Sequence, residues 1–331
     1  MTSRSHKAPF WKSSARTHRK CLAQPRDLSR RRFLGAAAVA LVAGQTGLSR
    51  ARAAEGRRNE ARARSVIVGA HPWVYAATQP KYDIYPILDQ IFADMKYAGM
   101  EGIELMHTAL RPGGAVERIA ALSQKHGLPV IGTSLGGEMW DRRRHAEVLA
   151  DAELVIPRLA KLGGKTLGTS VGSARGVKTP EQIDAQAEVL RKIMAICKSN
   201  GVVLNLHNHT YEVENGMHDL KGTLARIPDV KLGPDLNWLV RGGVDPVEFI
   251  RRYGERIVFL HLRDQKADGK WSEAMGEGSM DYAAIGKALR EAGFSGPAVI
   301  ELAHEGGFRP TRPLRESLKM SREFVRKTLG W

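Results

Sequence analysis

Four apolar segments in the C-terminal half of the chain each end in a side chain that can bind a metal ion through nitrogen or oxygen. These side chains are His207 and His209, Asp235, His261 and Glu301. Imidazole and carboxylate donors together suit Mn, Co, Zn, Fe or Mg rather than an ion that prefers thiolates. One such residue often has only a structural role, but a succession of them predicts a site for one divalent metal ion.

The elements that must position these residues alternate along the chain from residue 65 onward, as short β-branched runs and longer amphipathic segments. The predicted strands are 66–70, 102–106, 129–133, 165–169, 202–207, 231–235, 257–262 and 298–302. The predicted helices are 84–98, 115–125, 142–162, 180–199, 217–227, 246–253, 282–292 and 314–328.

This alternation predicts an α/β fold, a single (β/α)8 TIM barrel over residues 65–331, because such a barrel takes roughly 250 residues. No Gly-x-Gly-x-x-Gly turn follows the first predicted strand, which disfavours a doubly wound sheet. Functional groups of such barrels come from the C-terminal strand ends, so we expect the candidate metal ligands to meet at one rim.

Six short motifs resemble the xylose isomerase-like TIM barrels of sugar phosphate isomerases and epimerases, over essentially all of residues 65–331. They are Gly102-Ile103-Glu104-Leu105, Leu206-His207-Asn208-His209 with Glu212, Asp235-Leu236-Asn237-Trp238, His261-Leu262-Arg263-Asp264, Gly276-Glu277-Gly278 and Ile300-Glu301. The His-Asn-His motif is similar to that of a subgroup that is often exported and is associated with keto-sugars or 3-keto-glycosides.

The resemblance implies metal ligands from strands five to eight, where the epimerases have Glu, Asp, His and Glu. Asp235, His261 and Glu301 match this set, but His207 stands where the first glutamate is expected. Either Glu212 supplies the missing carboxylate as a ligand and a second catalytic group, or His207 and His209 change the chemistry. The residues expected to take part in catalysis are Glu301, His209 and Glu212.

Four further residues are expected to contact the substrate. His71 follows the first strand, Glu104 lies in the second, Trp238 could stack on a sugar ring, and Arg263 could hold a substrate oxygen. Each also has an ordinary structural explanation as a barrel-end or packing residue. The late loops contain no glycine-rich phosphate cradle or arginine cluster, so we expect a free or glycosidic sugar rather than a sugar phosphate.

The resemblance implies a metal-dependent isomerase or epimerase that acts on a keto-sugar or sugar-like polyol by enediolate proton transfer. An imidazole base could instead expel a β-leaving group, which would make the protein a dehydratase or a 3-keto-glycoside lyase or hydratase. A non-catalytic sugar-binding barrel is a third interpretation. An apurinic endonuclease is disfavoured because those enzymes gather three metals and present a basic surface to DNA.

The N-terminus carries a pattern typical of a twin-arginine signal peptide, predicted to span residues 1–53 and to be followed by a linker at 54–64. Ser29-Arg30-Arg31-Arg32-Phe33-Leu34 precedes an apolar run of ten residues, 35–44, which is too short to span a bilayer. We therefore expect recognition by the Tat export machinery, cleavage, no stable membrane anchor, and a periplasmic or extracellular location.

The predicted signal peptide also explains most of the basic charge, because it holds twelve Lys or Arg residues and one acid, Asp27. It thus contributes +11 of the formal net charge of +16, and about +5 remains for residues 54–331. This charge gives no reason to expect a nucleic-acid partner. Cys197 is the one cysteine after residue 53, so no internal disulfide is predicted. The sequence leaves assembly into a homo-oligomer open.

Overall fold

The computed structural model describes residues 66–331, and the predicted signal peptide and linker lie outside the described residues. All eight predicted strands are present, with ends that shift by a few residues. They are β1 (Val68–Ala70), β2 (Gly102–Met106), β3 (Val130–Gly136), β4 (Thr166–Ser170), β5 (Val203–Leu206), β6 (Lys231–Leu232), β7 (Leu260–Leu262) and β8 (Ala298–Ile300). β6 is short because Pro234 follows it and has no backbone N–H to give to a neighbouring strand.

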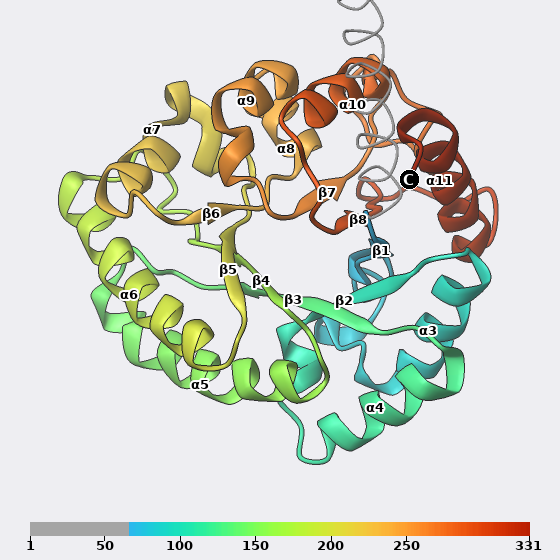
Figure 1. The fold of residues 1–331 in the computed structure, drawn as a ribbon, viewed down its shortest axis with the longest axis horizontal. Helices are drawn as coiled ribbons and strands as arrows, with labels where there is room; N and C mark the ends of the chain where they lie inside the picture. Colours follow the sequence, from blue (N-terminus) through green and yellow to red (C-terminus); the bar gives the residue numbers. More distant parts are fainter. Residues whose placement is uncertain (1–65) are drawn as a thin grey trace, which may run out of the picture. The chain divides into compact units, whose positions relative to one another are not determined.

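The strands form one parallel sheet in the order β6-β5-β4-β3-β2-β1-β8-β7. Parallel bridges from Leu232 to Ile257 and from Asp235 to His261 join the two outer strands. The His261 amide also donates to the Pro234 carbonyl oxygen at 3.0 Å. The sheet therefore closes into the predicted (β/α)8 TIM barrel, with helices around the outside (Figure 1).

Besides five short 3-10 helices, ten α-helices accompany the strands within residues 66–331. They are α2 (Trp73–Ala76), α3 (Leu88–Tyr97), α4 (Ala115–His126), α5 (His145–Lys161), α6 (Pro180–Ser199), α7 (Thr210–Arg226), α8 (Leu236–Arg241), α9 (Pro246–Tyr253), α10 (Tyr282–Glu291) and α11 (Leu314–Leu329). The short α2 and α8 were not predicted. The prediction also placed the start of α7 seven residues too late, because a non-helical stretch at 214–217 interrupts this helix.

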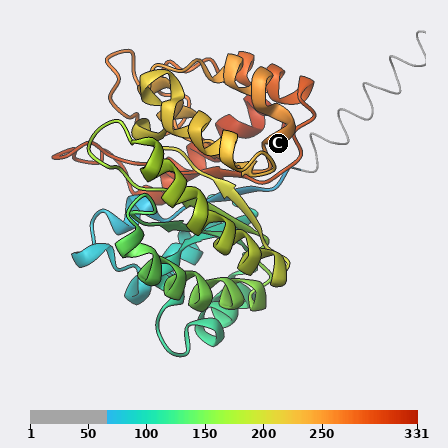
Figure 2. The same cartoon turned by 90° about the vertical axis from the view of Figure 1, so that its left-hand side faces the viewer.

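Helix ends and apolar spacing explain the outer layer. Thr179 caps α6 through a capping box with Gln182, and Pro180 occupies the first helical position, where no intrahelical N–H bond is needed. α5 buries Val148, Ala152 and Val155, whose spacing of three and four residues makes one apolar face. In Figure 2 the green and yellow-green helices lie on the outside of the strands. Among the helices of residues 66–331, none is both long and apolar enough to cross a membrane.

The barrel interior is closed below the site by an apolar plug of Ile131, Phe259 and Val299. Gly69 and Gly102 make room for this plug, since a Cβ atom on either would lie within 2.8 Å of the Ile131 side chain. The polar side chains of the strand ends gather above the plug, where a barrel of this kind carries its functional groups.

Candidate metal centre

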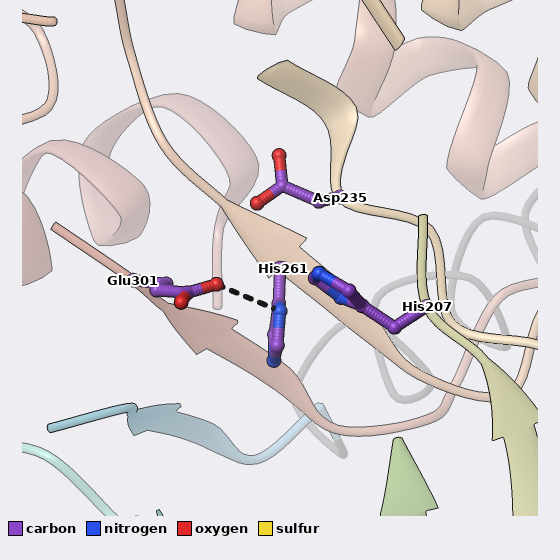
Figure 3. Close-up of side chains that lie close together, drawn as sticks. All are labelled: His207, Asp235, His261 and Glu301. Carbon is purple, nitrogen blue, oxygen red and sulfur yellow. Dashed lines mark ion pairs between the residues drawn. The ribbon is translucent and has the colours of Figure 1, made fainter. Parts of the chain in front are cut away.

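Four side chains from the last four strands meet at the C-terminal rim of the barrel (Figure 3). His207 directly follows β5, Asp235 caps the N-terminus of α8, His261 lies in β7, and Glu301 directly follows β8. Each offers one donor atom, and these four atoms lie within 4.8 Å of one another. The structure therefore brings together four of the five predicted ligands, and it places His207 in the position expected for the missing glutamate.

The donor atoms fit a divalent ion. One buried polar atom of each side chain makes no hydrogen bond of good geometry: His207 Nδ1, Asp235 Oδ2, His261 Nδ1 and Glu301 Oε2. Of these atoms, His261 Nδ1 and Glu301 Oε2 form an ion pair at 3.0 Å. Buried polar atoms without partners destabilise a fold and are uncommon. A cation bound by the two carboxylates and two imidazoles would supply the missing partner to all four atoms. The residues present are thus able to hold a metal ion, and all four are the hard or borderline donors that Mn, Co, Zn, Fe and Mg accept.

Glu104 orients His261 through the ring nitrogen that faces away from the cluster. Its Oε2 lies 2.5 Å from His261 Nε2, and its side chain is fully buried in the barrel. With Nε2–H donated to Glu104, the Nδ1 atom is left facing Glu301, whose Oε2 is 3.0 Å away. A carboxylate that fixes the tautomer of a ligating histidine is a common feature of metal sites. Glu104 was predicted to contact substrate, but the structure places it behind a candidate ligand instead.

The charges around the two imidazoles set their pKa values in opposite directions. Burial alone would lower the pKa of His261, but the Glu104 and Glu301 carboxylates outweigh burial and hold this pKa well above its usual range. Burial lowers the pKa of His207, and the neighbouring His261 and His209 lower it further. His207 is therefore a neutral imidazole, which is the form that binds a metal.

Arg263, which was expected to hold a substrate oxygen, lies among the carboxylates of the cluster. Its side chain is buried, and its NH2 atom lies 3.3 Å from Asp235 Oδ2 and 3.0 Å from Glu301 Oε2. Burial alone would raise the pKa of Glu301, but Arg263, His71 and His261 outweigh it and hold the pKa well below its usual range. Glu301 is thus a carboxylate in the folded protein.

Glu212 lies outside the cluster, in contrast to its predicted role as a ligand. Its Oε1 accepts hydrogen bonds from Ser170 Oγ at 2.7 Å and from the Val171 amide at 3.3 Å, while Oε2 accepts from the His209 amide at 2.6 Å. The carboxylate therefore closes the N-terminus of α7, and its oxygens are already engaged. The reason is the early start of α7, which places Glu212 in the first helical turn.

Replacing Glu212 by glutamine distinguishes the two roles. A glutamine has one acceptor oxygen, so at least one of the three donors loses its partner, and we expect the melting temperature to fall by about 2 to 5 °C. The affinity for Mn²⁺, measured by calorimetric titration, is expected to stay unchanged. A loss of affinity of about tenfold or more would restore Glu212 as a ligand.

His209 stands at the rim beside His207, with their ring centroids 4.9 Å apart. Its Nδ1 lies 3.0 Å from the Tyr211 hydroxyl and 3.2 Å from Ser170 Oγ, and its side chain is 35% exposed. The ring is therefore fixed by two hydroxyl groups yet open to a ligand in the mouth. Ser170 and Tyr211 were not predicted as site residues.

An aromatic wall borders the site on the side of α8. The Trp238 ring lies 5.6 Å from His209 and meets Trp271 edge to face at 5.5 Å. The Arg241 guanidinium covers Trp271 at 4.0 Å and pairs with Glu305 at 2.6 Å. Trp271 was missed in the sequence because it lies in a loop, more than thirty residues from Trp238.

The loop after β7 is held in shape by Asp264, the last residue of the His-Leu-Arg-Asp motif. Its buried carboxylate accepts hydrogen bonds from the amides of Gln265, Gly276, Gly278 and Met280, at distances between 2.8 and 3.2 Å. Gly278 must be glycine here, since a Cβ atom would lie 2.1 Å from Asp264 Oδ1. Hydrogen bonds within the protein thus fix the conformation of the loop that carries Trp271.

His71, the remaining predicted substrate contact, lies beside the cluster and is buried. Its Nδ1 accepts from the Trp73 amide at 3.2 Å and lies 3.4 Å from Glu301 Oε1, while Nε2 lies 3.3 Å from Ser134 Oγ. Burial lowers the pKa of His71 despite the nearby Glu301 and Glu104 carboxylates. The ring therefore packs beside the outer oxygen of Glu301, and its contact with substrate stays a prediction.

Fold and site together define a TIM barrel with a candidate metal centre of two imidazoles and two carboxylates at its C-terminal rim. Residues 92–324 match the model of the Xylose isomerase-like TIM barrel family, and the chain belongs to this family. It is a sugar isomerase- and epimerase-like barrel.

The chain is similar in sequence to a rhizopine catabolism protein and to an inosose dehydratase, and in structure to an epimerase. The chain is 25% identical over 250 residues to the rhizopine catabolism protein MocC of Rhizobium meliloti, covering 65% of this chain and 74% of that protein. It is 29% identical over 138 residues to inosose dehydratase of Geobacillus kaustophilus, covering 40% of this chain but only 37% of that enzyme. The structure of an L-ribulose 3-epimerase aligns with a TM-score of 0.65 at 20% identity, over 80% of this chain and 95% of that one.

Proposed function

We propose that the protein is a divalent-metal-dependent enzyme that moves a proton on the carbon next to a keto group of a sugar or sugar-like polyol, as isomerases and epimerases do. The observation that carries this proposal is the cluster of His207, Asp235, His261 and Glu301, whose donor atoms lie within 4.8 Å of one another and are buried without a hydrogen bond of good geometry. When bound, a divalent ion supplies a Lewis acid that polarises a carbonyl oxygen and so acidifies the adjacent C–H bond.

The residues of the chain divide the remaining tasks. Glu301 is a carboxylate whose Oε2 faces the cluster and whose Oε1 lies on the side of His71, free to take a proton from carbon. The electron pair of the broken C–H bond moves into the carbonyl group and gives an enediolate. His209 at the rim is placed to return a proton from a second direction, because its ring is open and held by Tyr211 and Ser170.

A second candidate is a dehydratase or a 3-keto-glycoside lyase or hydratase on the same site. The observation that favours it is the withdrawal of Glu212 into the α7 cap, which leaves one carboxylate base and one imidazole instead of two facing glutamates. After Glu301 takes the proton, an imidazolium at His209 would protonate the departing hydroxyl or alkoxide on the β-carbon. The inosose dehydratase among the relatives supports this candidate as well.

The aromatic wall supports a sugar as the ligand. Trp238 and Trp271 offer half-buried aromatic surface beside the cluster, and the apolar faces of sugar rings pack on such surfaces. Arg241 stiffens the wall through its contacts with Trp271 and Glu305.

The proposal is tested by exchange in deuterated water. The chain without the predicted signal peptide, residues 54–331, is stripped of metal and reloaded with Mn²⁺, Co²⁺, Zn²⁺, Fe²⁺ or Mg²⁺. It is then incubated with ketoses, inososes and 3-keto-glycosides. We expect metal-dependent uptake of deuterium next to a keto group. An epimeric or isomeric product supports the first candidate, and an unsaturated or dehydrated product supports the second. Sugar binding without exchange under any metal would instead mark a non-catalytic sugar-binding barrel.

We further propose that the chain is exported by the Tat machinery and acts in the periplasm or outside the cell, on the ground of the predicted signal at 1–53. Cell fractionation of the wild type and of a variant with Arg31 and Arg32 changed to lysine tests this. Retention of the lysine variant in the cytoplasm is expected, and equal export of both forms would contradict it.

A further inference from the structure

Arg263 is held in one position by bonds at both its backbone and its side chain. Its Nε donates to the main-chain oxygen of Glu301 at 2.7 Å. The hydroxyl of Tyr282, itself fully buried, donates to the Arg263 carbonyl oxygen at 2.6 Å and accepts from the Arg263 amide at 3.1 Å. The side chain is 3% exposed, and the guanidinium cannot turn to solvent without breaking the bond from Nε to the Glu301 main-chain oxygen.

The guanidinium faces the same oxygens that a metal ion would use. Its NH2 atom lies 3.3 Å from Asp235 Oδ2 and 3.0 Å from Glu301 Oε2. Both oxygens nevertheless lack a partner with hydrogen-bond geometry, so Arg263 offers them charge and leaves their lone pairs free.

The positive charge of Arg263 stabilises the metal-free site and destabilises the metal-bound site. Without a metal, Asp235, Glu301 and the nearby Glu104 repel one another in a buried environment, and a fixed cation offsets that repulsion. A divalent ion held by the four donors would lie close to the Arg263 guanidinium, and the two positive charges would repel each other at short range, where little water is present to screen them.

We propose that Arg263 is an internal counter-ion that holds the carboxylate ligands together before metal binding and weakens the binding of the divalent ion. The four donors alone would hold an ion more tightly than the wild-type site does. Arg263 thereby keeps the ion exchangeable while the ligand geometry stays assembled. This inference rests on the metal-binding part of the proposed function and not on the reaction.

The test compares Arg263→Met, which keeps the length of the side chain and removes its charge, with Arg263→Lys and with Arg241→Met. Arg241 is the control for the loss of one positive charge, because it also forms an ion pair but lies outside the cluster. Mn²⁺ affinity is measured by competition titration with a chelator, and melting temperatures are measured with and without Mn²⁺.

For Arg263→Met we expect Mn²⁺ to bind at least about tenfold more tightly than to the wild type. We also expect a lower melting temperature without metal and a larger rise when Mn²⁺ is added. Arg263→Lys is expected to melt close to the wild type, and Arg241→Met is expected to leave Mn²⁺ affinity unchanged. If Arg263→Met folds only when Mn²⁺ is present during refolding, that result also supports the proposal.

Equal or weaker Mn²⁺ binding by Arg263→Met overturns the counter-ion role, and so does a melting temperature without metal that equals that of the wild type. An equal gain of affinity in Arg241→Met overturns it too, because the effect would then follow net charge and not position. Failure of the proposed function looks different: a wild type and an Arg263→Met variant that both bind no divalent ion would remove the metal centre itself.

Discussion

Replacing Glu301 by glutamine is expected to slow proton exchange at the substrate carbon by about 1000-fold, the scale of losing a positioned general base. The change removes the one carboxylate whose oxygens face both the cluster and the outer side of the site, next to His71. A glutamine keeps the shape of the side chain but cannot accept the proton. The measurement is the rate of deuterium uptake by a substrate found in the exchange screen, at saturating Mn²⁺.

Glu273→Gln is the matched control for this experiment. Glu273 is also buried, but its carboxylate accepts hydrogen bonds from Thr311 at 2.9 and 2.7 Å, in the loop outside the cluster. We expect its exchange rate to stay within about tenfold of the wild type. Because Glu301 is also a candidate ligand, Mn²⁺ occupancy of Glu301→Gln must be measured alongside. Exchange that persists at the wild-type rate in an Mn²⁺-loaded Glu301→Gln would show that another residue is the base.

The replacement His261→Ala is expected to lower Mn²⁺ affinity by more than about 100-fold. Replacing a residue that only orients a metal ligand already lowers metal affinity by about 10- to 100-fold, and removing the ligand itself should lower it further. His261 sits at the centre of the cluster, between Glu104 and Glu301. Its loss also leaves Glu104 buried without a partner, which is expected to cost about 3 to 5 kcal/mol of folding free energy. Metal content after dialysis and chemical unfolding measure the two effects.

A second substitution separates these effects. Adding Glu104→Leu to His261→Ala removes the uncompensated carboxylate, so we expect the double variant to regain stability and still bind Mn²⁺ poorly. His145→Ala, which removes a buried imidazole bonded to the Met139 carbonyl oxygen on the outside of the barrel, is expected to keep full Mn²⁺ affinity. Full occupancy in the double variant would remove His261 from the set of ligands.

The sequence by itself determined the barrel and three quarters of the candidate metal centre. Strand and helix periods are local signals, and eight alternating units leave few folds open. Asp235, His261 and Glu301 each lie at the end of a strand, and parallel strands carry their C-terminal ends to one rim whatever the details of the loops. The convergence of these residues was therefore predictable without coordinates.

Only the tertiary structure decided the roles of Glu212, Glu104 and Arg263. The N-terminal turn of α7 and its bonds to Ser170 and Val171 draw Glu212 away from the cluster, and His207 takes the fourth place. The direction of Glu104 toward His261, and of Arg263 toward two carboxylates, follows from strands that lie far apart in the sequence. Spacing along a chain tells which rim a side chain reaches. Which neighbour it meets there depends on contacts from the whole barrel.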